Sequence, residues 1–366
     1  MIRATYRRVA TAFLLITFGI TLAAPAVSAP AVREPVRARS AMVASQHELA
    51  SKIGVEVMRR GGNAVDAAIA VGIALAVVYP EAGNIGGGGF MLIRFKDGKT
   101  HAIDYREMAP AAAHRDIFVD KDGNVIRGEG GSTIGYRASG VPGTIAGFEM
   151  ALAKFGSGKL KWKDLIEPSI PLARDGYVLT NRLASLLEGY KEHLSKYPDS
   201  NRIFLNNGKY FKEGDVFKQP ELAMTLKRIA EKGPREFYEG ETAKLIASDM
   251  RANNGLITLE DLKNYKAKER TPIRGTYRGH EIISMPPPSS GGIVMLQVLN
   301  ILEEWDIASM GHNSAAKYHL FTEASRRAFA DRAEYMADPD FADVPAAGLV
   351  SKSYAASRRK GIEPKK

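Results

Sequence analysis

The stretch NIGGGGF, residues 84–90, places four consecutive glycines directly before a run that reads as a β-strand. Glycine lacks a side chain, so such a run suits a place where backbone approaches other groups closely. Residues 90–105 predict a hairpin, because the Asp97-Gly98 pair between the two strand-like runs is typical of a tight turn. The second run continues into IDYREMAP, residues 103–110, and places Arg106 at the exit of the hairpin. The planar, permanently charged fork of an arginine suits a carboxylate.

The glycine run does not match a nucleotide-binding loop. Met91 and Leu92 occupy the positions where the third glycine of G-x-G-x-x-G should stand, and the run precedes a strand instead of a helix. A phosphate-binding G-x-x-x-x-G-K-[ST] is also excluded at Gly98-Lys99-Thr100, because Ile93 replaces its first glycine. We therefore interpret the glycines as close backbone packing beneath a site.

Hydrophobic periodicity and cap residues predict helices on both sides of the hairpin. They cover residues 46–60, 64–78, 143–154, 164–174, 221–231, 234–250, 289–304 and 314–336. Residues 64–78 are almost wholly apolar, so we expect this helix to be buried on all sides. A second strand pair is expected at 271–285, turning near Arg278-Gly279.

Composition places the chain among globular proteins, with 45% apolar and 25% charged residues in 366. The formal net charge of +10 comes from 51 basic and 41 acidic residues, and several of the basic ones lie near the two ends. No aromatic-basic platform accompanies these ends, so we predict no nucleic-acid partner. The absence of cysteine excludes disulfides, cysteine nucleophiles and thiolate metal sites.

The first residues have the pattern of a secretory signal peptide. Arg3, Arg7 and Arg8 precede an apolar stretch at 9–24, and small residues then allow cleavage after Ala26 or Ala29. We expect a signal peptide at 1–26, a linker at 27–40 and the main region at 41–366. No segment is long enough for a stable membrane span, so the predicted location is a bacterial periplasm or the secreted space.

Other polar groups have simpler explanations than catalysis or metal binding. Ser289 and Ser290 lie in no G-x-S-x-G frame, and we expect them to cap the helix that follows. Judged by residue type alone, Arg106 would form a surface ion pair with Asp104 or Glu107.

A group of acidic residues ends the helix predicted at 314–336, and its spacing matches no calcium loop. The group comprises Asp331, Glu334, Asp338 and Asp340, with Arg326, Arg327 and Arg332 nearby as expected structural ion-pair partners. The seven histidines form no zinc motif. We therefore predict no metal and no cofactor.

From about residue 41 to 354 the chain resembles the large subunit of the gamma-glutamyltransferases, also called glutathione hydrolases. The matching segments are GGNAVDAA at 61–68, the glycine run, the Arg106 motif, GVPGT at 140–144, RTPI at 270–273 and PPPSSGG at 286–292. The resemblance implies an α+β fold of the N-terminal-nucleophile hydrolase type. This is a four-layer αββα sandwich, with two sheets between helix layers, built jointly from two fragments of one precursor.

The resemblance also implies the chemistry. The precursor cleaves itself before a threonine, whose new amine and hydroxyl carry out acyl transfer. The resemblance implies that Arg106 binds the α-carboxylate of the glutamyl donor. It also implies that the substrate is glutathione or another gamma-glutamyl compound. The donor-binding serines of the family belong to the small subunit, so Ser289 and Ser290 receive no substrate role.

No Thr-Thr-His-like junction occurs in the sequence, so we expect 41–366 to be a large-subunit region that is incomplete at its C-terminal end. The expected partner is a small subunit that carries the N-terminal threonine, and no catalytic residue is assigned in this chain. Two alternatives stay open. One is a related cephalosporin acylase or poly-gamma-glutamate depolymerase, and the other is a non-catalytic gamma-glutamyl-binding homologue.

Overall fold

The computed structural model describes residues 35–363 of the chain, so the signal peptide predicted at 1–26 lies outside the described residues. The chain divides into a unit at Met1–Met42 and a larger unit at Val43–Lys366. Residues 35–40, the described part of the predicted linker, contain no helix or strand. All elements below belong to the larger unit, and no helix in the described part of the chain has the length and apolar character that a membrane crossing requires.

The predicted hairpin is confirmed. Strands β1 (Phe90–Arg94) and β2 (Thr100–Asp104) pair antiparallel with Phe90 opposite Asp104. The turn between them needs a left-handed residue, and Gly98 supplies it with φ of 86°. A short third strand, β5 (Lys268–Arg270), was not predicted as part of this sheet and adds to β2 in the order β1-β2-β5.

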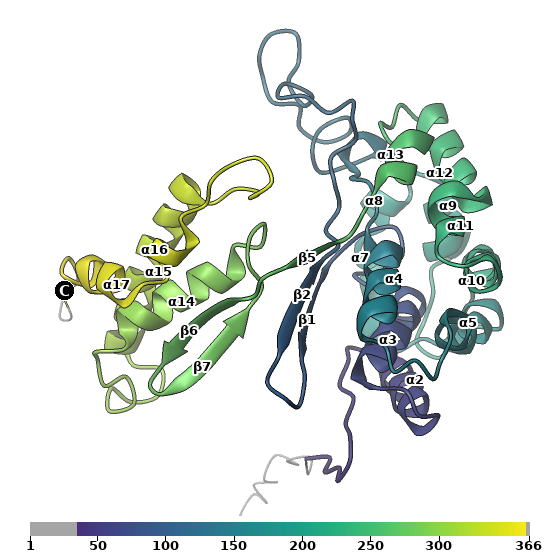
Figure 1. Cartoon of the computed structure of the whole chain (residues 1–366). Coiled ribbons are helices and arrows are strands. Elements are labelled where there is room, and N and C mark those ends of the chain that lie inside the picture. The colour runs from purple at the N-terminus through teal and green to yellow at the C-terminus, as the bar shows by residue number, and fades with distance from the viewer. Residues whose placement is uncertain (1–34, 364–366) are drawn as a thin grey trace, which may run out of the picture. The chain divides into compact units, whose positions relative to one another are not determined.

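Two predicted helices pack beside this sheet (Figure 1). Helix α3 (Ala64–Val78) has the predicted bounds, begins with a capping box between Asn63 and Asp66, and is buried along most of its length. Helix α4 (Thr144–Phe155) lies against it, so closely that a Cβ on Gly72 would stand 2.4 Å from the ring of Phe148. Helix α2 (Glu48–Arg59), also predicted, completes this group. Small residues therefore let the helices approach closely.

The middle of the chain is a set of short helices with one small strand pair. The helices are α5 (Trp162–Ile166), α6 (Ile170–Arg174), α7 (Asn181–Gly189), α8 (Lys191–Leu194), α9 (Pro198–Phe204), α10 (Pro220–Lys232), α11 (Arg235–Glu239), α12 (Glu241–Ala252) and α13 (Leu259–Asn264). The strand pair is β3 (Tyr177–Val178) with β4 (Val216–Phe217).

Two predicted helices are divided in the structure. The helix expected at 164–174 changes to a 3₁₀ turn at Glu167–Ser169, where Pro168 has no backbone N–H to donate. The helix expected at 234–250 breaks at Gly240, whose backbone is extended with φ of −90° and ψ of −153°. In both cases the periodic pattern continued through a residue that interrupts the hydrogen-bond ladder.

The last part of the chain forms a second hydrophobic cluster. Strands β6 (Ile273–Tyr277) and β7 (His280–Ser284) make the predicted hairpin, with positive φ at Arg278 and Gly279. Helices α14 (Gly291–Leu302) and α15 (Ala315–Tyr335) follow close to their predicted bounds, and α16 (Ala346–Leu349) and α17 (Lys352–Arg359) complete the group. Buried residues of α14, α15 and α17, such as Ile301, Leu320 and Ala355, form the cluster.

Candidate functional site

Arg106 lies just beyond the end of β2, and its side chain is exposed. The ion pair with Asp104 or Glu107 that its residue type favoured does not form, because Asp104 pairs with Arg270 instead. Within residues 35–363 the Arg106 guanidinium has no ion pair and donates no hydrogen bond to another residue. Its five N–H donors are therefore open to solvent or to a ligand.

Arg106 is one of the residues that line a small polar hollow of about 40 Å³. Three chain segments contribute its charged lining: Asp104, Arg106 and Glu107 at the end of β2, Lys266, Lys268 and Arg270 at β5, and Asp338 and Asp340 after α15. The site thus combines residues that are more than 230 positions apart in the sequence, from 104 to 340.

Four of these eight charged residues form ion pairs with one another. The guanidinium of Arg270 donates to both carboxylate oxygens of Asp340, at 2.8 and 2.7 Å, and its Nε donates to Asp104 at 3.2 Å. Lys268 also donates to Asp340, at 2.5 Å. These hydrogen bonds, first from Arg270 and then from Lys268, hold the pKa of the Asp340 carboxyl far below its usual range. Arg270 is thereby compensated, whereas Arg106 keeps an unpaired positive charge.

The peptide groups of Arg106 are held by two side chains. Its N–H donates to Oδ1 of Asp104 at 3.1 Å, and its carbonyl oxygen accepts from the hydroxyl of Tyr265 at 2.7 Å. Burial raises the pKa of that hydroxyl well above its usual value, so Tyr265 remains a proton donor near neutral pH.

The glycine run packs directly against the Arg106 segment, as its composition predicted. A Cβ on Gly88 would lie 2.5 Å from the carbonyl oxygen of Tyr105 and 2.8 Å from the nitrogen of Glu107. The carbonyl of Gly87 accepts hydrogen bonds from the N–H groups of Gly143 and Thr144, at 2.7 and 3.1 Å. A larger residue at position 88 would push the Arg106 segment out of place.

The GVPGT motif at 140–144 meets the same segment. A Cβ on Gly143 would lie 2.0 Å from the carbonyl oxygen of Tyr105 and 2.1 Å from the hydroxyl of Tyr265. Asn84 ties the two motifs together, because its Oδ1 accepts from the N–H of Gly87 at 2.9 Å and from the hydroxyl of Thr144 at 2.8 Å. Motifs that are separate in the sequence therefore form one support for Arg106.

The predicted capping role holds for Ser289 but not for Ser290. Ser290 occupies the N-cap position of α14 but makes no side-chain cap, because its backbone is helical (φ −80°, ψ −16°) where a capping residue is usually extended. Its hydroxyl accepts from Nε of Arg332 at 2.9 Å instead. The hydroxyl oxygen of Ser289 accepts a hydrogen bond from the N–H of Gly291, the first residue of α14, at 3.4 Å.

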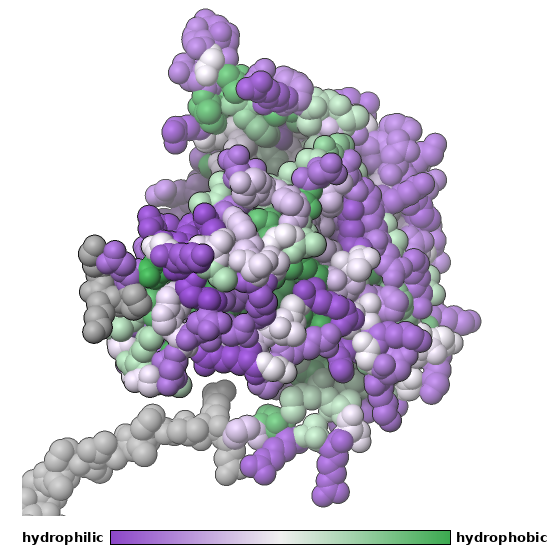
Figure 2. Space-filling model, turned by 60° about the vertical axis from the view of Figure 1, so that its left-hand side comes forward, coloured by the Kyte–Doolittle hydropathy of each residue, from purple (hydrophilic) through white to green (hydrophobic). Residues whose placement is uncertain are grey.

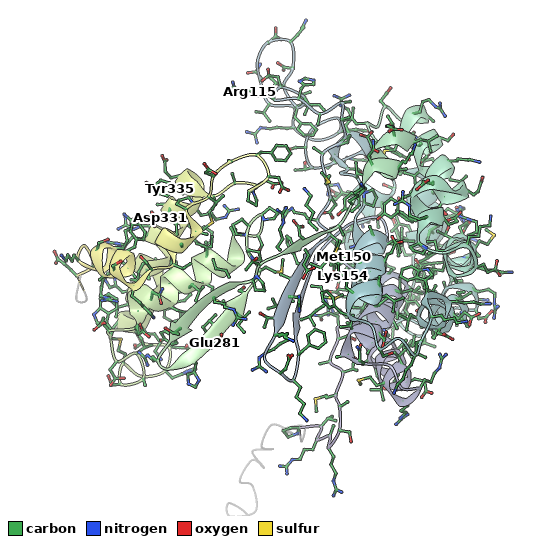
Figure 3. All side chains as sticks on the ribbon, in the orientation of Figure 1. Arg115, Met150, Lys154, Glu281, Asp331 and Tyr335 are labelled. Atoms are coloured by element: carbon green, nitrogen blue, oxygen red, sulfur yellow. The ribbon has the colours of Figure 1, made fainter. Side chains whose placement is uncertain are left out.

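Two of the four residues in the acidic group near the end of α15, Asp331 and Asp340, form ion pairs, although not with the expected arginines. Asp331, which Figure 3 labels on α15, pairs with Arg358 at 3.2 Å and accepts from Gln297 at 2.8 Å. Arg326 and Arg327 pair with Glu323, one helical turn away. In the described part of the chain no group of three or more histidine or acidic side chains is arranged to hold a metal ion.

The sequence reasoning singled out Arg106 but missed the residues that support it. Arg270 stood inside a recognised motif, RTPI, without a role, and Asp104 was considered only as a surface partner. Tyr265 carried no signal, since it follows an ordinary short helix at a distance of 159 residues from Arg106.

Comparison with known proteins gives the site its context. A family model described as gamma-glutamyltranspeptidase matches residues 50–366. The glutathione hydrolase proenzyme of Escherichia coli (strain K12) is 50% identical, over 98% of this chain and 62% of that protein. The acylase ACY 1 proenzyme of Pseudomonas sp. (strain SE83) is 39% identical, over 90% of this chain and 60% of that protein. The chain thus spans about three fifths of the length of these curated relatives.

The crystal structure of Helicobacter pylori gamma-glutamyltranspeptidase superposes with a TM-score of 0.87 and 46% identity, covering 91% of this chain and 95% of that one. This likeness confirms the predicted α+β fold of the N-terminal-nucleophile hydrolase type. Because the family match covers most of the sequence and the relatives are close, the chain belongs to the gamma-glutamyltranspeptidase family of enzymes.

Proposed function

We propose that this chain is the donor-binding part of a glutathione hydrolase that cleaves gamma-glutamyl amide bonds and transfers the glutamyl group to water, an amino acid or a peptide. Arg106 holds the α-carboxylate of the donor. A small subunit, from the same precursor or a separate chain, supplies the N-terminal threonine. The threonine hydroxyl attacks the γ-carbonyl carbon, its own amine takes the proton, and the amine portion of the substrate leaves with a proton. Water or an acceptor amine then releases the glutamyl group.

The observation that carries this proposal is the unpaired guanidinium of Arg106 on a fixed backbone. A fork with five donors can bind both oxygens of one carboxylate, which a lysine ammonium cannot do with the same geometry. The neighbouring Arg270 is already neutralised by Asp104 and Asp340, so Arg106 is the arginine in this lining that is open to an incoming carboxylate.

Exposed apolar residues support the presence of a partner subunit. Tyr318, Phe321 and Phe329 of α15 are each more than half exposed. Figure 2 shows that hydrophilic residues cover most of the surface in that view, with hydrophobic ones in separate patches. Among the described strands, β1 has a neighbour on one side only. Such a strand edge and such aromatic side chains are typical of surfaces that a second chain covers.

The location follows from the sequence pattern of the first residues. We propose export to the periplasm or beyond, directed by the signal peptide at 1–26, with cleavage after Ala26 or Ala29. N-terminal sequencing of the mature protein from cell fractions tests this assignment.

A second candidate function is acylase activity on a substrate other than a gamma-glutamyl compound. The 39% identity with the acylase ACY 1 proenzyme favours it. Turnover of gamma-glutamyl donors compared with other acyl amides separates the two candidates, and only the first requires a carboxylate on Arg106.

The decisive variant is Arg106→Lys in the enzyme completed with its small subunit. We expect normal self-cleavage and a loss of donor binding of roughly 2–4 kcal/mol, because a two-point carboxylate contact becomes a point charge. Arg115→Lys is the matched control, since Arg115 is exposed on the long loop between β2 and α4 (Figure 3). Wild-type donor affinity in a normally processed Arg106→Lys enzyme would refute the assignment. The 366-residue chain alone should release no glutamate.

A further inference from the structure

We infer that Tyr265 and Asp104 are positioning residues that fix the backbone of Arg106 and thereby set the direction of its guanidinium toward the donor carboxylate. This inference rests on the proposed function of Arg106. It assigns a role to a tyrosine hydroxyl and a buried carboxylate that do not themselves bind substrate.

Arg106 lies in a gap between two stretches of paired backbone. The hairpin ladder ends with Tyr105 and Gly89, which exchange N–H to carbonyl hydrogen bonds at 3.0 and 3.3 Å. Backbone pairing resumes at Met108, which exchanges hydrogen bonds with Val141 at 3.2 and 2.8 Å. Between these anchors, the N–H and carbonyl of Arg106 are satisfied by Asp104 and Tyr265 instead of by a strand. We call this pair of contacts the backbone clamp.

The ring of Tyr265 is held in place by a second tyrosine. Its ring stacks on that of Tyr238 with centroids 5.8 Å apart and an angle of 8° between the planes. Tyr238 is itself fully buried, donates its hydroxyl to the carbonyl of Pro142 at 3.0 Å, and accepts from the N–H of Ala146 at 3.1 Å. The absence of a side chain at Gly143 leaves the space that the Tyr265 hydroxyl occupies.

Asp104 is held in place by an ion pair. Its second oxygen pairs with Arg270, and Arg270 is fixed in turn by two hydrogen bonds to Asp340. Asp104 is only 7% exposed, so this ion pair is shielded from solvent. Both arms of the clamp therefore end in rigid parts of the structure.

The consequence for binding is geometric. Within residues 35–363 the Arg106 side chain forms no hydrogen bond or ion pair that would fix it, so the direction of its backbone decides where the guanidinium points before substrate arrives. A carboxylate contact through two N–H groups tolerates little misalignment, and preorganising it reduces the entropy lost on binding. Releasing one arm of the clamp should weaken donor binding while leaving the chemical step unchanged.

The test is Tyr265→Phe in the enzyme completed with its small subunit. The variant removes one hydroxyl and keeps the stacked ring, and we expect KM for the donor to rise about 3- to 10-fold with kcat within about twofold of the wild type. Tyr177→Phe is the control, because Tyr177 is also a buried tyrosine but its hydroxyl has no hydrogen-bond partner in the structure. It should leave both constants unchanged.

A double variant separates positioning from general damage. In an Arg106→Lys background the KM effect of Tyr265→Phe should vanish, because the contact that the clamp aligns is already lost. An effect that persists in that background, or no effect in the wild-type background while Arg106→Lys is impaired, overturns the inference and leaves the proposed function standing. An Arg106→Lys enzyme with unchanged donor affinity overturns both. Should Tyr265→Phe not fold, Asp104→Ala removes the acceptor on the other arm, and Asp340→Asn is its control, because it also releases Arg270 but leaves the Arg106 N–H bonded to Asp104.

Discussion

Arg106 and Arg270 both lie beside the carboxylate of Asp104, but their environments differ. Arg270 is largely buried and shares its charge with Asp104 and Asp340, and these hydrogen bonds, chiefly those to Asp340, raise its pKa further. Arg106 is exposed and has no such partner among the described residues. Arg270 is therefore structural, whereas Arg106 is available for a ligand. Residue type alone does not distinguish these two roles.

The pH dependence of stability tests the structural pair. The folded-state pKa of Asp340 lies below its ordinary value of 3.8, so its ion pairs stabilise the fold above about pH 4 and are lost as the pH falls through the folded value. We expect Asp340→Asn to lower the melting temperature of the completed enzyme at pH 7. The difference from the wild type should shrink between pH values of about 4 and 2.

Asp343→Asn serves as the control, because Asp343 lies on the same loop but is exposed and forms no ion pair within residues 35–363. Thermal melts over this pH range are the measurement. A difference between Asp340→Asn and the wild type that stays constant from pH 7 downward would show that the charge of Asp340 does not contribute in this way.

At the scale of elements, glycines allow particular helices and loops to pack in close contact. Gly147 of α4 lies against the ring of Tyr105, with a Cβ position 2.2 Å from that ring, and a Cβ on Gly72 of α3 would lie 2.4 Å from the ring of Phe148 of α4. The N-terminus of α4 is thus pressed against both the hairpin and α3. These contacts place the glycine run, α4 and the Arg106 segment in one rigid support.

Substituting Gly143 should break that support. In Gly143→Ala the new Cβ meets the carbonyl of Tyr105 and the hydroxyl of Tyr265, and backbone has to move because a carbonyl cannot swing aside. We expect the free energy of unfolding to fall by roughly 1–3 kcal/mol, as for other overpacked sites. Chemical denaturation of the completed enzyme measures it.

Gly189→Ala is the matched control at the end of α7. A Cβ there meets nothing within 4 Å, and alanine favours a helix over glycine, so this variant should be neutral or slightly more stable. Equal stability of the two variants would mean that the close approach at Gly143 relaxes without cost.

At the scale of the whole molecule, the described residues expose apolar side chains that a self-sufficient protein would tend to cover. Phe341 is 81% exposed, and Phe321 and Phe329 of α15 exceed 50%. The sheet β1-β2-β5 also has an unpaired edge at β1 in the described part of the chain. Both features favour association with another chain.

We therefore expect the mature chain alone, from about Val27 onward, to be loosely folded or prone to aggregation. Refolding it with the complementary small subunit should give a compact heterodimer, because a partner that binds only the native state stabilises it by mass action. Size-exclusion chromatography and denaturant melts, with and without the partner, make the comparison. A monodisperse monomer with a sharp transition would instead favour the non-catalytic binding homologue.

The sequence by itself determined the local elements and the family. The bounds of α3, the turn at Gly98 and the hairpin at Arg278-Gly279 followed from hydrophobic period and turn chemistry, which act over a few neighbouring residues. The strand β5 did not follow, because three residues carry too little periodicity to be recognised. Arg106 was identified because its motif is local and resembles that of a known family.

Only the tertiary structure decided what surrounds Arg106. Its hydrogen bond with Tyr265 joins residues 159 positions apart, and the Arg270 pair with Asp104 spans 166. Partners at such separations depend on the path of the chain through space, and no local pattern encodes them. The path of the chain also explains why Asp331 forms an ion pair with Arg358 of another helix instead of with the arginines nearest to it in the sequence.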